Sequence, residues 1–361
     1  MSGFFAQRYT PPFRHELPGT MKEMVENESP VRKFSANFKL LRRWLWLKMN
    51  LPSRLLRDRL PPPPRRLLWL NYSSTSIGDS IMELAGRSML GAYEIDLLTD
   101  PVHAELYLHD RFFKSVFIDA EQLDSSRYDF VILDLFNTRS IRLKRSIGPN
   151  LPCACLQSFF YGAHFNRMLF SCYRIHHLLG YPYNDVQLQP FLRPSLFVDA
   201  EPSPLPPRRK RRFALMLGGV EPFKTYQHWP KVIRMLRARW PAEREFPEFV
   251  LIGSTNAVPN VEPVMTALKG CDAASHVGSL TLRQTATALT ASDFFLGTDG
   301  GLMHCAVALD VPGVALFGKF PPKLLLPPKS KMNSIYNEQD VNNIPAAAVA
   351  DAVLKQLETK N

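Results

Sequence analysis

The residues best suited to chemistry are Asp299 to His304, which lie in the stretch SDFFLGTDGGLMHCAVALDVPGVALFG at positions 292–318. The pattern predicts an apolar strand over 294–297, a glycine turn, and a helix over about 302–309. Asp299 stands where the N-cap of that helix is expected. A helix N-terminus that follows a parallel strand presents unpaired backbone amides to anions. The segment therefore predicts a phosphate site, and an enzyme that acts on nucleotide derivatives is the first hypothesis.

The parts of this motif are expected to act together. Gly300 and Gly301 let the backbone approach a ligand closely, and their amides with that of Leu302 would point at a bound anion. His304, one turn inside the helix, can donate to a phosphate or to a neighbouring hydroxyl. Taken singly, each residue has a structural alternative, because aspartate often only caps a helix and a helix histidine is more often a satisfied core residue.

Two further candidate residues follow predicted strands. Asp79 comes after the strand LLWLN and the loop that ends in Gly78, at or just before a helix start. There it could accept a proton from a hydroxyl, or it could only cap the helix. Lys224 lies in GGVEPFKTYQHWP, in the loop before another helix. It offers a compact positive charge to a phosphate, and its structural alternative is an exposed loop lysine.

Two alternating series of strands and helices are expected to position these residues. Short apolar strands separated by helices predict parallel sheets covered on both faces. The predicted strands are 67–71, 94–99, 115–119, 129–135, 213–219, 249–254, 294–297 and 313–317. The predicted fold class is therefore α/β, with two Rossmann-like domains that face each other across a ligand-binding cleft. The expected parts are a basic extension over 1–64, domains over 65–200 and 208–345, and a C-terminal helix over 346–361.

Charge is spread unevenly along the 361 residues. The formal net charge is +11, and residues 1–66 hold 14 Lys and Arg against 5 Asp and Glu, which leaves +2 for the rest. A body so close to neutral argues against a nucleic-acid groove, and the run RRKRR at 208–212 is expected to be a solvated face. The basic character belongs to the N-terminal extension.

That extension predicts a basic amphipathic helix from about Phe34, in which tryptophans accompany leucines and arginines. Residues 31–60 could lie on an anionic membrane surface, or the helix could pack on the body with a solvated basic side. Four prolines at 61–64 end the segment. No stretch is apolar enough to span a membrane, and no secretory signal or metal site is expected. An odd number of cysteines, five, fits reduced thiols in a cytoplasmic protein.

Three of these segments together resemble the lipopolysaccharide heptosyltransferase family, glycosyltransferase family 9. They are the Gly78–Asp79 turn, the segment from Lys224 to Pro230, and the DxGxxH pattern at 299–304 with its run to Gly318. The resemblance covers roughly 67–317 and implies the GT-B fold. It also implies inverting, metal-independent transfer of a sugar, most often heptose from ADP-heptose, to a hydroxyl of a lipopolysaccharide or other glycan acceptor. No cofactor is implied beyond this donor.

The resemblance assigns roles to the same residues. Asp79 would be the general base on the acceptor side, and Lys224 would neutralise the donor diphosphate. Asp299, Gly300, Gly301, Leu302 and His304 would complete the donor site. The implied location is the cytoplasm, peripheral to the inner membrane. Two alternatives stay open: a non-catalytic GT-B protein that binds a nucleotide or a membrane, and a GT-B nucleotide-sugar epimerase.

The sequence departs from the family pattern at three places. Gly300 stands where the family usually has threonine, and the FGP turn becomes Phe317-Gly318-Lys319. The glutamate expected after the strand FVLIGS is displaced to Glu262. These changes bear on the identity of the donor more than on the type of reaction.

Overall fold

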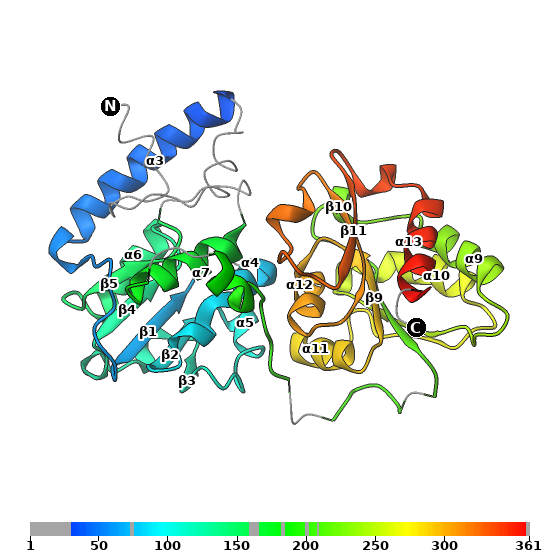
Figure 1. Ribbon diagram of the computed structural model, residues 1–361, viewed down its shortest axis with the longest axis horizontal. Coiled ribbons are helices and arrows are strands. Elements are labelled where there is room, and N and C mark those ends of the chain that lie inside the picture. The colour runs from blue at the N-terminus through cyan, green and yellow to red at the C-terminus, as the bar shows by residue number, and fades with distance from the viewer. Residues whose placement is uncertain are drawn as a thin grey trace. The chain divides into compact units, whose positions relative to one another are not determined.

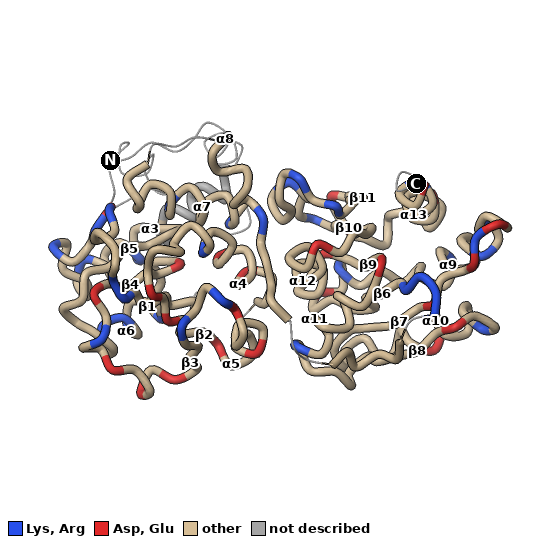
Figure 2. Tube along the Cα trace, turned by 60° about the horizontal axis from the view of Figure 1, so that its bottom comes forward, with Lys and Arg blue, Asp and Glu red and all other residues tan. Residues whose placement is uncertain are grey.

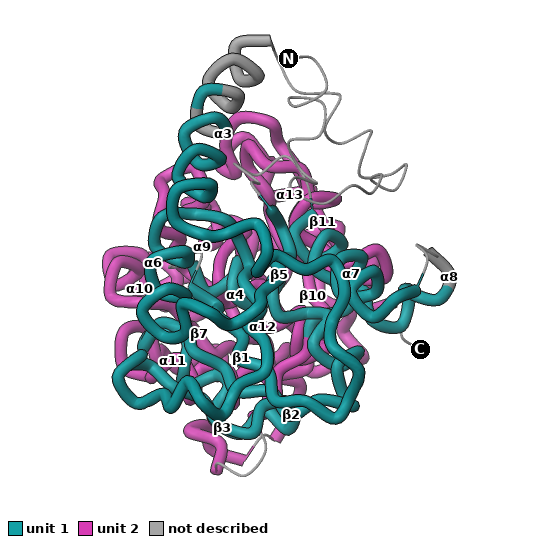
Figure 3. The backbone as a smooth tube through the Cα atoms, turned by 90° about the vertical axis from the view of Figure 1, so that its left-hand side faces the viewer, with its two compact units in different colours: residues 1–194 teal, residues 195–361 magenta. Residues whose placement is uncertain are grey.

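The computed structural model describes residues 30–72, 76–158, 166–181, 185–198, 202–207 and 209–358. The chain divides into two compact units, residues 1–194 and 195–361, which Figure 3 distinguishes by colour. Each unit is built around one parallel sheet, and each is described here by itself. The predicted α/β class is confirmed.

Unit 1 contains a five-stranded parallel sheet in the order β3-β2-β1-β4-β5. Its strands are β1 (Arg66–Asn71), β2 (Glu94–Thr99), β3 (Ser115–Phe117), β4 (Phe130–Leu133) and β5 (Cys153–Cys155). Every residue of β4 is buried, as its near-continuous apolar run predicted, and every residue of β5 is buried as well. β1 comes first in the sequence but lies between β2 and β4 in the sheet. The chain adds β2 and β3 on one side of β1 and then crosses to the other side for β4 and β5, so the switch point lies between β1 and β4.

Helices cover the faces of this sheet (Figure 1). They are α4 (Ile77–Glu83), α5 (Pro101–Ala104), α6 (Thr138–Ile147) and α7 (Arg167–Leu178), and the short α8 (Asp185–Leu188) packs on α7. A 3-10 segment at Ala85–Leu90 follows α4. The chain between α7 and the second unit contains α8 and a 3-10 turn at Gln189–Phe191.

The basic helix of the extension is α3 (Pro30–Asn50), and its C-terminal half packs on unit 1 against α6. Leu47 and Leu51 are buried in the same apolar cluster as residues of β1, β4 and β5. Beyond the helix, the chain runs beside β5, where the amide of Arg57 donates to the carbonyl of Cys153 at 2.9 Å. The packed alternative is therefore correct for this face of the helix.

Unit 2 contains a six-stranded parallel sheet in the order β11-β10-β9-β6-β7-β8. Its strands are β6 (Arg212–Met216), β7 (Glu248–Ile252), β8 (Ala273–Ser275), β9 (Phe294–Thr298), β10 (Gly313–Gly318) and β11 (Met332–Asn337). Its helices are α9 (Trp229–Arg239), α10 (Val261–Ala267), α11 (Leu282–Thr290), α12 (Gly301–Ala308) and α13 (Ala346–Glu358). The C-terminal helix α13 packs on α9 and β10 and buries Val349 and Val353 in the unit's core.

The strand order of unit 2 determines where a ligand can approach its sheet. In sequence order β6 comes first, yet it lies between β7 and β9, so the direction of winding reverses between β6 and β9. In open α/β sheets, ligands bind at the carboxyl ends of the strands at such a switch point. The loops that leave β6 and β9 contain Lys224 and Asp299, respectively.

Candidate active site

Lys224 and Asp299 come together at the switch point of unit 2. The Lys224 ammonium lies 2.9 Å from an Asp299 carboxylate oxygen and 3.6 Å from the carboxylate of Glu221. The Asp299 side chain is buried, with 4% of its surface exposed, whereas that of Lys224 is 16% exposed. Burial opposes the charged form of Lys224, but the carboxylates of Asp299 and Glu221 raise its pKa above the ordinary value. Lys224 is thus a fixed, charged ammonium at the carboxyl edge of the sheet.

The loop that carries Lys224 is held by hydrogen bonds to its neighbours. The Thr298 hydroxyl, at the end of β9, donates to the carbonyl of Lys224 at 2.6 Å. The amide of Gly219 donates to the Thr225 hydroxyl at 3.2 Å, and the Asn256 side chain donates to the carbonyl of Gly219 at 2.7 Å. These contacts join the loops after β6, β7 and β9, so Lys224 is positioned by the sheet edge as a whole.

Asp299 does not cap α12, contrary to the sequence-based expectation. The helix begins at Gly301, and its N-cap is Gly300 in an extended conformation with no side-chain cap. Asp299 lies one residue earlier, where its carboxylate turns to Lys224 and its amide donates to the carbonyl of Leu316 at 2.8 Å. The ion pair with Lys224 explains why this aspartate contacts the lysine loop and does not cap the helix.

The first turn of α12 remains available to an anion. Gly300, Gly301 and Leu302 are half-buried, and the leading amides of a helix have no intrahelical acceptor. The carbonyl of Gly300 accepts from the amide of His304 at 3.2 Å. The His304 ring is 5% exposed, and its Nε2 lies 3.8 Å from the other Asp299 oxygen. The structure thus brings Lys224, Asp299 and His304 into one cluster beside the three leading amides.

Gly300 lies close to the side chain of Met216, the last residue of β6. A Cβ added to Gly300 would lie 2.8 Å from the terminal methyl of Met216, which is the far end of a flexible side chain. The backbone of Gly300 has φ 174°, a value that any residue adopts. A threonine at this place would therefore require only that Met216 move. The methyl of Met216 fills space beside the amides that a larger residue would occupy.

In unit 1, Asp79 lies inside the first turn of α4 and not ahead of it. The helix starts at Ile77 with Ser76 as N-cap, so Asp79 is the third helical residue. Its carboxylate lies 3.3 Å from Nε of Arg167, the first residue of α7, and the side chain is 25% exposed. The other end of the Arg167 guanidinium lies 2.6 Å from Glu83, which is buried one turn after Asp79 on the same helix.

A buried polar network, for which the sequence shows no local signal, continues from this pair. The amide of Asn71 donates to Glu83 at 3.2 Å and to Asp134 at 2.8 Å, and the Trp69 indole donates to Asp134 at 2.7 Å. Burial, with the nearby carboxylate of Glu83, raises the pKa of Asp134 well above its ordinary value. Asp134 follows β4 and Asn71 ends β1, so the network spans the switch point of unit 1.

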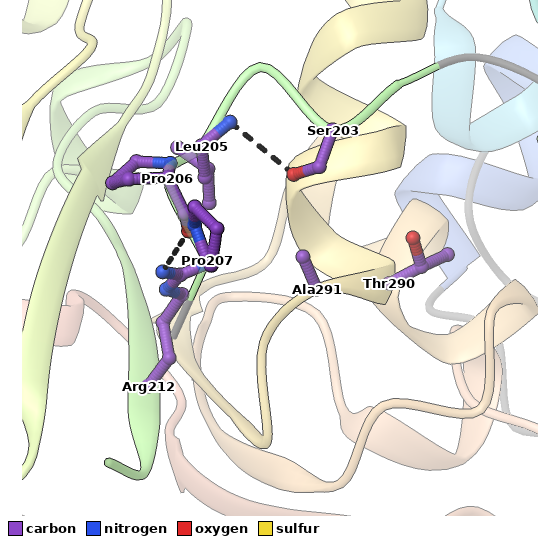
Figure 4. Close-up of a pocket in the computed structure, with 7 residues that line it drawn as sticks. All are labelled: Ser203, Leu205, Pro206, Pro207, Arg212, Thr290 and Ala291. Atoms are coloured by element: carbon purple, nitrogen blue, oxygen red, sulfur yellow. Dashed lines mark hydrogen bonds between the residues drawn. The ribbon is translucent and has the colours of Figure 1, made fainter. Parts of the chain in front are cut away.

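A cavity of about 530 Å³ lies elsewhere in unit 2, at the amino edge of its sheet (Figure 4). Arg212 opens β6, and Thr290 and Ala291 lie at the end of α11 just before β9. The remaining lining residues are Ser203, Leu205, Pro206 and Pro207. The Arg212 guanidinium is already bound by Glu248 and by the carbonyl of Pro206. This cavity is therefore separate from the Lys224–Asp299 cluster.

One prediction concerns the approach of two backbones at Gly219. A Cβ there would lie 2.7 Å from Cβ of Lys224 and 2.9 Å from its carbonyl oxygen, so Gly219→Ala must displace the lysine loop. We expect the variant to stay folded, to lose about 1–3 kcal/mol of unfolding free energy, and to bind a diphosphate ligand more weakly. Chemical denaturation and calorimetric titration measure the two effects. The matched control is Gly91→Ala, whose nearest contact would be an unstrained 3.7 Å; equal losses in both variants would contradict the prediction.

A family model matches part of this chain. The family model described as glycosyltransferase family 9 (heptosyltransferase) matches residues 166–348, which include all the unit 2 candidates but not Asp79. No curated protein sequence matches the chain. Among the residues that the structure describes, no group of three or more His, Cys, Asp or Glu is placed to hold a metal ion.

Solved structures share the fold. A family 9 glycosyl transferase from Veillonella parvula has a TM-score of 0.67 at 13% identity, over 84% of this chain and 100% of that one. The ADP-heptose lipopolysaccharide heptosyltransferase II of E. coli gives 0.57 at 18% identity, over 82% and 99%. The E. coli heptosyltransferase WaaC with ADP gives 0.57 at 14% identity, over 81% and 98%.

Proposed function

This chain belongs to glycosyltransferase family 9, the heptosyltransferase family, and from that premise we propose that it transfers a heptose-type sugar from ADP-heptose to a glycan hydroxyl. The observation that carries the proposal is the ion pair of Lys224 with the buried Asp299 beside the leading amides of α12, at the switch point of the unit 2 sheet. One of the similar structures is described as an ADP-heptose lipopolysaccharide heptosyltransferase, and another is a heptosyltransferase with ADP. The acceptor class we propose is lipopolysaccharide or a related glycan.

The donor binds unit 2 through its diphosphate in this proposal. As the bond between the sugar carbon and the diphosphate oxygen breaks, negative charge develops on the leaving nucleotide. Lys224 and the amides of Gly300, Gly301 and Leu302 are placed beforehand to stabilise that charge. Asp299 keeps Lys224 in position, and His304 supports the same turn. These groups supply positive charge without a metal ion, so we propose a metal-independent reaction.

The acceptor reacts through Asp79 of unit 1. Its carboxylate is accessible to solvent and is fixed on one side by Arg167. It takes the proton of the acceptor hydroxyl as the oxygen attacks the sugar carbon from the face opposite the diphosphate, which inverts the configuration at that carbon. In this proposal the donor binds unit 2 and the acceptor binds unit 1.

A donor panel followed by a transfer assay tests this function. Sugars linked to ADP, GDP, UDP and CMP are compared by thermal shift, since a ligand that binds only the folded state raises its apparent stability. We expect the ADP-linked heptose to give the largest shift and to yield glycan product with an acceptor. Donor binding without product across a broad acceptor panel would instead indicate a non-catalytic protein. Epimerised sugar released without any acceptor would indicate an epimerase.

We also propose that the second face of α3 lies on an anionic membrane surface. Phe38, Leu41, Leu45 and Met49 are 68%, 39%, 46% and 74% exposed, and their spacing places them on the side of the helix opposite Leu47. Arg42 and Lys48, both exposed, flank this stripe. An exposed apolar stripe between basic residues is the pattern of a helix that lies in a membrane interface. None of the helices that the structure describes is long and apolar enough to cross a membrane.

A double variant tests the membrane proposal. Phe38→Ser/Met49→Ser removes exposed apolar surface without touching the packed face, so unfolding should be unchanged while binding to vesicles weakens. Co-sedimentation with vesicles that contain phosphatidylserine, at low salt, measures this, and we expect about a tenfold or greater loss. The matched control is Val102→Ser, which removes an exposed apolar side chain (57%) elsewhere on unit 1. Unchanged sedimentation of the double variant would refute the proposal.

A further inference from the structure

Lys319 lies at the carboxyl end of β10, one strand away from the end of β9. It follows Gly318, the last residue of β10, and β10 pairs directly with β9. Its amide donates to the carbonyl of Asn337 at 3.1 Å, which continues the pairing with β11, and its side chain is exposed. The residue therefore stands at the same sheet edge as the Lys224–Asp299 pair.

The side chain of Lys319 approaches the same aromatic pair as Lys224. The rings of Phe223 and Phe320 lie 6.3 Å apart, edge to face. The Lys224 ammonium is 5.7 Å from each ring centroid, and that of Lys319 is 5.1 Å from Phe223 and 5.8 Å from Phe320. A Cβ on Gly318 would lie 2.8 Å from the carbonyl of Phe223, so the two loops are in close contact. Both lysines thus belong to one cluster, which we call the two-lysine cluster (Lys224, Lys319, Phe223 and Phe320).

The charges around Lys224 show why a second cation matters. Lys224 contacts two carboxylates, Asp299 and Glu221, so these three groups together carry a formal charge of −1. A diphosphate that approached them alone would meet net negative charge, which the partial positive charge of a helix N-terminus offsets only in part. In the described residues, no carboxylate lies within ion-pair distance of Lys319. The positive charge of Lys319 brings the formal charge of Lys224, Asp299, Glu221 and Lys319 together to zero.

The backbone at Lys319 is unusual for a lysine. Its φ is +65°, in the left-handed region that glycine adopts without penalty and that other residues adopt at a cost. A strained residue at the edge of a ligand site is grounds for a functional hypothesis. The surrounding loop is also basic: residues 319–331 contain Lys319, Lys323, Lys329 and Lys331 and no Asp or Glu. Figure 2 shows stretches of Lys and Arg positions beside β10 and β11.

Resting on the proposed function, in which a nucleoside diphosphate-linked donor binds unit 2, we infer that Lys319 is a second cationic contact for the donor diphosphate. Lys224 is the half-buried ammonium of the two-lysine cluster, fixed by its carboxylate partners, and Lys319 is the exposed ammonium that contacts the phosphates from the β10 side. The residue contributes to donor affinity. It replaces the proline of the family turn, so this contact distinguishes the chain from relatives that keep the family pattern.

Titration of ADP and of inorganic pyrophosphate into the full chain tests the inference. In Lys319→Gly the dissociation constant for ADP is expected to rise about two- to fivefold at low salt, and its salt dependence to weaken. Because glycine adopts positive φ freely, the thermal midpoint of the same variant should stay level or rise. A structural defect would lower both the thermal midpoint and the affinity for ADP. Weaker ADP binding together with an unchanged or higher thermal midpoint therefore identifies a ligand contact. Lys319→Arg keeps the charge and should bind as the original chain does.

Lys329→Gly is the matched control, since it removes one lysine from the same loop near the amino end of β11, at the other edge of the sheet. It should leave ADP affinity unchanged. Equal ADP affinity in Lys319→Gly and the original chain would overturn the inference while leaving the proposed function intact. Lysine-dependent binding of pyrophosphate without any binding of ADP would support the phosphate contact and contradict the nucleotide donor. Binding of neither probe would overturn both.

Discussion

Replacement of Asp79 by asparagine should lower kcat for sugar transfer about 10²–10⁴-fold while donor binding and folding are preserved. Asparagine has almost the shape of aspartate but cannot take the proton of the acceptor hydroxyl. Arg167 keeps a counter-charge in the variant, because Glu83 remains 2.6 Å away. The guanidinium is therefore not left unpaired, and the loss should appear in turnover and not in stability. Steady-state kinetics with a saturating donor measure it.

The control for Asp79 is its neighbour Glu83, which contacts the same guanidinium but is buried, with 1% of its side chain exposed. Glu83→Gln removes a charge from the Arg167 pair without touching the exposed carboxylate. We expect it to lower the unfolding free energy by about 1–3 kcal/mol and to change kcat little. If Asp79→Asn turned over like the original chain, Asp79 could not be the base. If Glu83→Gln lost as much kcat as Asp79→Asn, the effect would belong to the arginine pair.

Strand and helix periodicity predicted most of the framework that positions these residues. β2 has the bounds that were predicted for it, 94–99, and α12 and β10 lie within one residue of their predicted bounds. The short edge strands β5, β8 and β11 were not predicted. Three or six residues with mixed polarity, as in MNSIYN, have no strong period, and they become strands only because a neighbouring strand supplies hydrogen-bond partners.

The chemistry of the site was predictable where it follows strand ends and not where it depends on tertiary contacts. Lys224 and Asp299 could be proposed because each follows an apolar strand. That they pair, and that Asp299 therefore does not cap α12, follows from the strand order, which places β6 beside β9. Arg167 gave no local signal, since it is 88 residues from Asp79 in sequence and meets it only through the packing of α7 on α4. Sequence alone likewise could not show the positive φ of Lys319.

Lys224→Met should reduce kcat/KM about 10²–10³-fold, because it removes a fixed positive charge from the place where the leaving diphosphate gains negative charge. The same change leaves the buried carboxylate of Asp299 without its closest ion-pair partner, the Lys224 ammonium at 2.9 Å. Breaking one partner of a buried pair costs about 3–5 kcal/mol of stability. A loss of activity in the single variant would therefore mix an electrostatic effect with a folding defect.

The double variant Lys224→Met/Asp299→Asn separates the two effects. Removing both charges should recover much of the lost unfolding free energy, since no unpaired buried charge remains, and the coupling between the two sites follows from the double-mutant cycle. Activity should not recover, because the diphosphate still lacks its ammonium partner. Lys231→Met, which removes an exposed lysine from α9 in the same unit, is the matched control and should change neither quantity. Recovery of kcat/KM together with stability would mean that Lys224 only balances Asp299, and the donor's charge would then have to be met by the α12 amides and Lys319.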